Sequence, residues 1–228
     1  MLSLPQRGVI SLVLYRLPIL IFAMGIVYVF IVPPEPFILN MLFKLIPILM
    51  IIIYSLRKLP HKKSAIHWLI PVGLVFGMIG NATSHQWGIG FLSFLIGHIL
   101  YTTGFLTKWT YSRKRLIMTL PFIIYGLWFG NLLLHNLYLN ESNLFTLTIL
   151  LYLVVLVVMA LVATMTGNTW AILASLLWVI ASSMAIWDTC ITSIDYVEPI
   201  VVFIYYSAQF FLAHSLESFN RKNKMLIW

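Results

Sequence analysis

The chain has 228 residues, of which 61% are hydrophobic and only 9% are charged, with 14 Lys and Arg against 6 Asp and Glu. A soluble domain has roughly half apolar and about 25% charged residues. This composition therefore argues against a soluble enzyme, a disordered chain and a disulfide-rich scaffold. The single cysteine, Cys190, excludes an internal disulfide and a zinc site built from thiolates.

Continuous apolar stretches recur along the whole chain, whose mean hydropathy is +0.99. A membrane-spanning helix needs roughly 20 such residues. In chain order the stretches predict eight transmembrane helices, at 9–32, 37–56, 65–84, 88–107, 116–135, 144–163, 170–189 and 197–217. Because no long polar segment separates them, we expect one all-α transmembrane bundle over residues 1–228. The first span is expected to be retained, since it is too long for a signal peptide and Arg16 interrupts it.

The connecting segments alternate in charge along the chain. Acidic residues lie in the loops that follow the first, fifth and seventh spans, whereas the other charged segments are basic. The basic set outside the spans is Arg7, Arg57, Lys58, Lys62, Lys63, Lys108, Arg113, Lys114, Arg115, Arg221, Lys222 and Lys224. Basic loops stay in the cytoplasm, so we expect both termini there, in a multi-pass protein of the plasma membrane whose basic loops meet anionic lipids. The net charge of +8 is then a sign of topology and not of nucleic-acid binding.

Ionisable and polar residues inside the predicted spans are costly, so each is a functional candidate. Arg16 and Lys44 are the basic ones, and either can instead reach the nearest interface with its long side chain. His98 and Asn81 can instead make ordinary hydrogen bonds between helices. Asp188 can instead lie at the wet outer interface.

The polar residues inside the spans lie at similar predicted depths in the membrane. With both termini inside, the polar residues of five spans fall between the midplane and the outer surface, whereas chance would scatter them over both halves. They are Lys44, Asn81, His98, Ser183, Asp188, Tyr205 and Gln209. The pattern predicts one polar pocket in the outer half of the bundle.

Five short segments carry a resemblance. They are KLIP at 44–47, GMIGN at 77–81, HILY at 98–101, WDT at 187–189 and YYSAQ at 205–209. In this order and spacing they resemble the lysoplasmalogenase family, the YhhN-like membrane proteins, from about residue 40 to the end of the last span. The resemblance implies an eight-helix membrane hydrolase that cleaves the vinyl ether bond of lysoplasmalogens. Its products are a fatty aldehyde and a glycerophosphoethanolamine or glycerophosphocholine.

The resemblance also suggests which residues form the site. The family pattern has two aspartates, thought to be catalytic, at the positions of Asn81 and Ser183. We expect the catalytic region to contain these two positions together with the remaining acid and base, and the substrate to contact polar neighbours. The catalytic candidates are Asn81, Ser183, Asp188 and His98, and the substrate-binding candidates are Lys44, Tyr101, Tyr205 and Gln209.

Vinyl ether hydrolysis begins with protonation of an alkene carbon, so it needs an acid and a negative charge near the resulting oxocarbenium ion. Asn81 and Ser183 supply neither, which leaves Asp188 and His98 for these roles. Three hypotheses remain: a hydrolase of a lysoplasmalogen or related lysolipid, a relative that binds or senses a lipid without cleaving it, and a small transporter. No metal or organic cofactor is expected, because no ligand cluster has metal spacing.

Overall fold

The computed structural model describes residues 4–137 and 143–219, which form helices joined by short loops. The helices are α1 (Leu4–Phe30), α2 (Phe37–Arg57), α3 (Ile66–Ala82), α4 (Trp87–Leu106), α5 (Arg113–Leu137), α6 (Asn143–Thr166), α7 (Thr169–Cys190) and α8 (Val197–Ser218). Over the described residues the fold is all-α, and its helices coincide with the predicted spans to within a few residues. Glu141 and the basic tail residues Arg221, Lys222 and Lys224 lie outside the described residues.

Helix length separates the elements into two groups. Among the described residues, six helices are long and apolar enough to cross a membrane, and these are α2, α4, α5, α6, α7 and α8. The described apolar parts of the other two are shorter, at Arg16–Phe30 in α1 and Ile66–Ala82 in α3. The predicted span 65–84 is thus too long, since α3 has 17 residues. It ends at Ala82 because the polar run 83–86 turns there, with the Thr83 amide donating back to Ile79.

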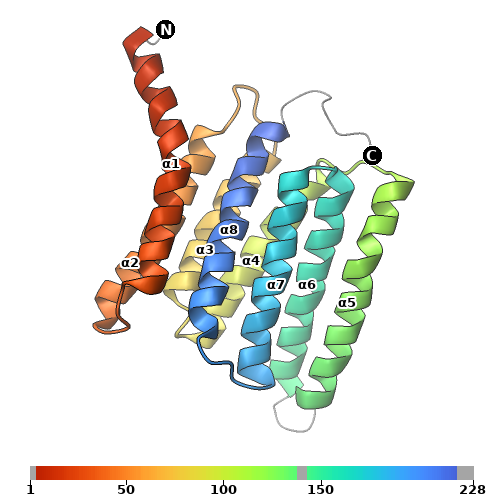
Figure 1. Cartoon of the computed structure of the whole chain (residues 1–228). Helices are drawn as coiled ribbons and strands as arrows, with labels where there is room; N and C mark the ends of the chain where they lie inside the picture. Colours follow the sequence, from red (N-terminus) through yellow and green to blue (C-terminus); the bar gives the residue numbers. More distant parts are fainter. Residues whose placement is uncertain (1–3, 138–142, 220–228) are drawn as a thin grey trace.

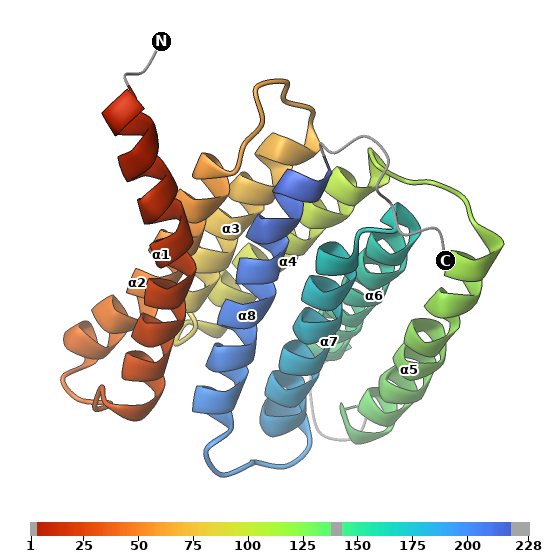
Figure 2. The same cartoon turned by 45° about the horizontal axis from the view of Figure 1, so that its top comes forward.

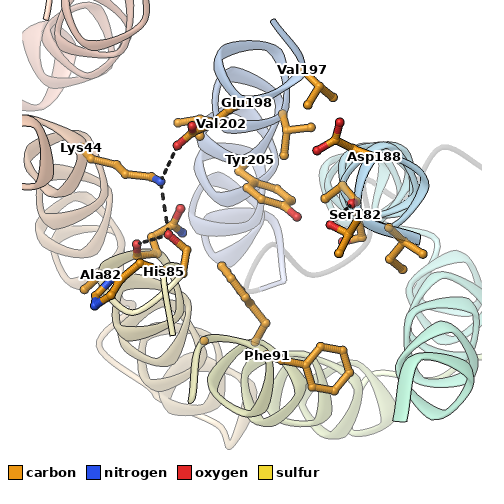
Figure 3. Close-up of a pocket in the computed structure, with 18 of the residues that line it drawn as sticks. Lys44, Ala82, His85, Phe91, Ser182, Asp188, Val197, Glu198, Val202 and Tyr205 are labelled. Atoms are coloured by element: carbon orange, nitrogen blue, oxygen red, sulfur yellow. Dashed lines mark hydrogen bonds and ion pairs between the residues drawn. The ribbon is translucent and has the colours of Figure 1, made fainter. Parts of the chain in front are cut away.

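Six helices close into a ring. Each contacts its two neighbours in the order α2, α3, α4, α6, α7, α8 and back to α2, as the view along the helices in Figure 3 also shows. α3 and α8 additionally contact each other across the ring. α1 packs outside against α2 and α8, and α5 packs outside against α6 and α7 (Figures 1 and 2).

Alternation of helix direction gives the bundle two different ends. The start of α1, the α2–α3, α4–α5 and α6–α7 loops and the end of α8 lie at one end (Figure 1). The α1–α2, α3–α4 and α7–α8 loops lie at the other. Basic residues of the α2–α3 and α4–α5 connections, such as Lys62 and Arg113, are therefore gathered at the first end, which we call the basic end.

Candidate functional site

A cavity of about 630 Å³ lies inside the ring at the end opposite the basic end. All six ring helices line it, and α1 adds Tyr28. Its walls combine apolar and aromatic side chains, such as Phe91, Phe94 and Val202, with a small polar set. The polar residues at its surface include Lys44, Asn81, Ser182, Asp188, Glu198 and Tyr205.

Lys44 forms one polar side of the cavity (Figure 3). Its Nζ lies 3.1 Å from a carboxylate oxygen of Glu198 on α8 and donates to the Ser84 hydroxyl at 3.4 Å. The Lys44 side chain is 10% exposed, whereas that of Glu198 is 70% exposed. The Tyr206 hydroxyl donates to the Lys44 carbonyl at 2.8 Å and ties α8 to α2 at this level. Lys44 therefore lines the cavity, with its ammonium directed toward the α3–α4 loop and the start of α8.

Asp188 and Ser182 lie across the cavity from Lys44, both on α7, with the Tyr205 ring between the two sides (Figure 3). One Asp188 carboxylate oxygen accepts the Ile194 amide at 2.7 Å, which fixes the turn between α7 and α8. The Ser182 hydroxyl lies 3.1 Å from the Tyr152 hydroxyl of α6. Asp188 also lines the cavity and is the acidic side chain on this side of it.

The two positions where the resemblance implies aspartates differ in placement. Asn81 is buried at the cavity surface, with its Nδ2 donating to the Gly77 carbonyl at 2.9 Å. Ser183 does not line the cavity, and its hydroxyl donates to the Val179 carbonyl at 2.6 Å. The preceding residue, Ser182, faces the cavity instead, so the two positions do not face each other across it.

Three other predicted site residues lie deeper in the ring than the cavity. His98 and Tyr101 of α4 are each 1% exposed and Gln209 of α8 is fully buried, and none of them lines the cavity. Tyr205 does line it and lies one turn from Gln209 on the same face of α8. The structure thus brings Lys44, Asn81, Asp188 and Tyr205 together around one space and places the others below it.

Sequence reasoning missed several polar residues of the cavity, of which Glu198 and Ser182 matter most for its chemistry. Glu198 belongs to the acidic segment after the seventh span, and an acid at the outer start of the last span is the signal for a pair with Lys44. The resemblance points to Ser183 and not to its neighbour Ser182. The face of α7 that meets the cavity contains Ser182, Ala185, Ile186 and Thr189, in steps of three and four residues.

The charged side chains around the cavity determine which kind of ligand it can bind. Two carboxylates, from Asp188 and Glu198, and one ammonium, from Lys44, border an otherwise largely apolar space. Such a space suits an amphiphile whose charged head stays near Lys44 and whose apolar part contacts the aromatic walls. Among the described residues, no group of three or more His, Cys, Asp or Glu side chains is placed to hold a metal ion.

Comparison with known proteins identifies the family. A model of the YhhN family matches residues 39–216, which cover all six helices of the ring. No curated protein and no solved structure matches the chain. The match extends over well more than half of the sequence and contains every ring helix that lines the cavity. The chain therefore belongs to the YhhN family.

Proposed function

We propose that this protein is a membrane hydrolase of the lysoplasmalogenase type, which cleaves the vinyl ether bond of a lysoplasmalogen or related lysolipid. One observation carries the proposal: a single cavity, within the part of the chain that matches the YhhN family, is bordered by Lys44, Glu198 and Asp188. The family resemblance of the sequence supports the same reaction.

The charged and apolar parts of the cavity fit the two parts of a lysolipid. Lys44 binds a phosphate oxygen as a point charge in place of the Ser84 hydroxyl. The glycerol and the start of the alkenyl chain contact the aromatic wall formed by Phe91, Phe94 and Tyr205. A lysolipid has one chain, which suits a cavity of about 630 Å³ better than two chains would.

The reaction follows from these placements. The carboxylic acid form of Asp188 gives its proton to the alkene carbon that is not bonded to oxygen, and the other alkene carbon becomes part of an oxocarbenium ion. Glu198, already ion-paired with Lys44, adds negative charge at the cavity during this step. Water adds to the cationic carbon and returns a proton to Asp188. The hemiacetal hydroxyl then loses its proton, the glycerol oxygen gains one, and the bond between that oxygen and the hemiacetal carbon breaks, giving a fatty aldehyde and a glycerol hydroxyl.

The fold suggests how the protein sits in the membrane. The basic end faces the cytoplasm and its anionic lipids, with both termini on that side, and the cavity opens toward the outer surface of the plasma membrane. The substrate then enters from the outer half of the bilayer.

The test is aldehyde release from lysoplasmalogen by the purified protein. Wild type should release aldehyde, and the variants Asp188→Asn and Glu198→Gln should each lose most of the rate. Asp195→Asn, which removes an exposed carboxylate of the same loop outside the cavity, should leave it unchanged. Equal rates in wild type and in the double variant Asp188→Asn, His98→Ala would contradict the proposal.

A second candidate function is binding of a lysolipid without cleavage. It is favoured by Asn81, an amide at a cavity position where the family pattern has a carboxylate. Under this proposal, wild type binds lysolipid but gains hydrolysis only when carboxylates are restored. The informative pair is Asn81→Asp with Ser182→Asp, which faces the cavity, against Asn81→Asp with Ser183→Asp, which does not. This candidate fails if wild type is already as active as both double variants.

A further inference from the structure

Four polar side chains form a layer directly beneath the cavity. His98 and Tyr101 of α4, Trp178 of α7 and Gln209 of α8 are each at most 1% exposed. Their buried atoms without a hydrogen-bond partner in the described structure are His98 Nε2, Tyr101 Oη, Trp178 Nε1 and both amide atoms of Gln209. We call these four residues the deep polar layer. Buried polar atoms are normally hydrogen-bonded, so this concentration of unpaired groups points to a ligand.

The four side chains are close to one another. The rings of His98 and Trp178 lie 4.5 Å apart, and those of His98 and Tyr101 lie 5.9 Å apart. Tyr101 and Gln209 meet at Gly77 of α3, where an added methyl group would lie 3.0 Å from Gln209 Nε2 and 3.7 Å from the Tyr101 hydroxyl. The absence of a side chain at Gly77 therefore leaves room for these two polar groups where α3 and α8 approach across the ring.

The hydrogen-bonding capacity of the layer defines what fits there. His98 Nδ1 lies 2.6 Å from the Phe94 carbonyl, which can only accept, so Nδ1 carries the hydrogen. Nε2 of the neutral ring is then an acceptor. Trp178 Nε1 can only donate, whereas Tyr101 and Gln209 can do both. None of the four side chains carries a formal charge when the imidazole is neutral. The matching ligand is a small neutral molecule that both donates and accepts, which is the chemistry of water.

Aromatic rings separate the layer from the cavity. Phe94 and Tyr205 line the cavity with their rings 5.8 Å apart, and both contact Trp178, at 6.0 and 4.8 Å. Tyr152 also lines the cavity, and its ring lies 5.4 Å from that of His98. These rings form an aromatic floor between the cavity and the layer.

We propose that the deep polar layer is a buried water-binding site, closed off from the cavity by Phe94 and Tyr205. Resting on the proposed hydrolase function, it also stores the water that adds to the oxocarbenium ion. Water held beneath Phe94 and Tyr205 reaches the reactive carbon from the floor of the cavity, whereas the exposed Glu198 lies at its wall. The aromatic floor keeps this water from the reactive carbon until the rings move.

Radiolytic labelling in H₂¹⁸O tests the site without any substrate. Hydroxyl radicals formed from bound water by an X-ray pulse label the side chains next to it, and mass spectrometry locates the ¹⁸O. Tyr101 and Trp178 should label several-fold faster than Phe105 and Phe129, each rate being divided by that of the same residue in unfolded protein. Phe105 and Phe129 are matched controls, since they are 0% and 1% exposed and have no polar atoms. Labelling of Tyr101 and Trp178 no faster than these controls would overturn the proposal.

Variants test whether the labelling depends on the residues of the deep polar layer. Gln209→Leu, which removes two of the unpaired atoms at similar volume, should reduce Tyr101 labelling several-fold, and Tyr205→Phe should leave it high. If Gln209→Leu does not fold, His98→Phe gives the same comparison on Trp178. Unchanged labelling in the folded variants would also overturn the site. Aldehyde release is measured separately. If wild type releases no aldehyde, the hydrolase proposal is rejected and the water site is unaffected. If the Gln209→Leu variant shows no Tyr101 labelling but releases aldehyde at the full rate, the storage role is rejected.

Discussion

At the scale of single residues, Lys44 both forms the ion pair with Glu198 and is the proposed binding residue for the lysolipid phosphate. Its ammonium is largely removed from solvent and has Glu198 and Ser84 as partners, whereas Glu198 remains mostly exposed. The two partners are therefore not equivalent. Losing the carboxylate leaves a buried cation with one weak neighbour, while losing the cation leaves an anion that water can still solvate.

Replacing Lys44 tests its role in binding the head group. Lys44→Met keeps the aliphatic length but removes the charge-assisted hydrogen bond to phosphate. A bond to a charged group contributes about 1.5–3 kcal/mol, so lysolipid affinity should fall by at least about tenfold. Titration of purified protein with a lysophospholipid, followed by tryptophan fluorescence, measures it. Lys62→Met, on an exposed loop at the basic end, is the matched control and should bind as wild type does.

Glu198 should affect stability more than Lys44 does. Glu198→Gln leaves the buried ammonium without its anion, so we expect a loss of about 1–3 kcal/mol in the free energy of unfolding. Lys44→Met should cost less than this, because Glu198 stays solvated. Thermal unfolding in the same detergent compares the two variants, and a larger loss for Lys44→Met would contradict the order.

Asp188 has a structural and a chemical role that two substitutions separate. Asp188→Asn keeps an oxygen that can accept the Ile194 amide, so it should fold with nearly wild-type stability. Asp188→Ala also leaves that amide unpaired and should cost roughly 1 kcal/mol. Both remove the proton donor, so both should reduce aldehyde release by about 10²–10⁴-fold. Activity in Asp188→Asn near that of wild type would exclude Asp188 as the acid.

The sequence was sufficient to group Lys44, Asn81, Asp188 and Tyr205 at one depth, because depth depends only on span boundaries and topology. It was not sufficient to choose between Ser182 and Ser183. Neighbouring residues on a helix point about 100° apart, and both serines are equally polar, so the choice depends on how α7 is rotated in the ring.

At the scale of elements, glycines let α3 and α4 pack closely. An added methyl group at Gly73 would lie 2.4 Å from the Tyr101 ring, and the ring is held between α3 and the other members of the deep polar layer. An added methyl group at Gly97 would similarly meet the backbone of α3, 3.2 Å from the Gly73 carbonyl oxygen. Gly73 and Gly97 thus let the two helices pack closely and position polar side chains of α4.

Alanine substitution distinguishes this packing from helix propensity. Gly73→Ala should destabilise the protein by about 1–3 kcal/mol, because Tyr101 has to move out of a filled space. Gly88→Ala, where nothing lies within 4 Å, should be neutral or gain up to about 1 kcal/mol. Thermal unfolding of both variants in one detergent is the measurement. Equal stability of the two would show that α3 and α4 do not pack as described.

Element positions were well predicted, whereas their neighbours were not. Apolar length placed each helix within a few residues, and the first and third spans were extended past their helix ends, the third into the polar turn 83–86. In the ring α4 is followed by α6, because α5 lies outside it. Hydropathy along the sequence does not predict this order. Nearly every face of these helices is apolar, so periodicity does not mark which face meets a neighbour and which meets lipid.

At the scale of the whole molecule, charge and cavity lie at opposite ends of one bundle. The loops with Lys62 and Arg113 share an end, and the α7–α8 loop beside Asp188 belongs to the other (Figure 1). Basic loops resist transfer across a membrane. The cavity should therefore open away from the cytoplasm, and this orientation decides which leaflet supplies the lysolipid.

Cysteine labelling tests this orientation with few changes, since Cys190 is the single cysteine of the chain. In a Cys190→Ser background, Ser193→Cys places a thiol in the exposed α7–α8 loop and Lys62→Cys places one in the exposed α2–α3 loop. A membrane-impermeant maleimide added to intact cells should label the protein at position 193 and leave position 62 unlabelled. After the membrane is opened with detergent, both should react. Labelling of position 62 alone in intact cells would show that the bundle has the opposite orientation. Lys44 and Asp188 would then face the cytoplasmic leaflet, and the substrate would come from inside the cell.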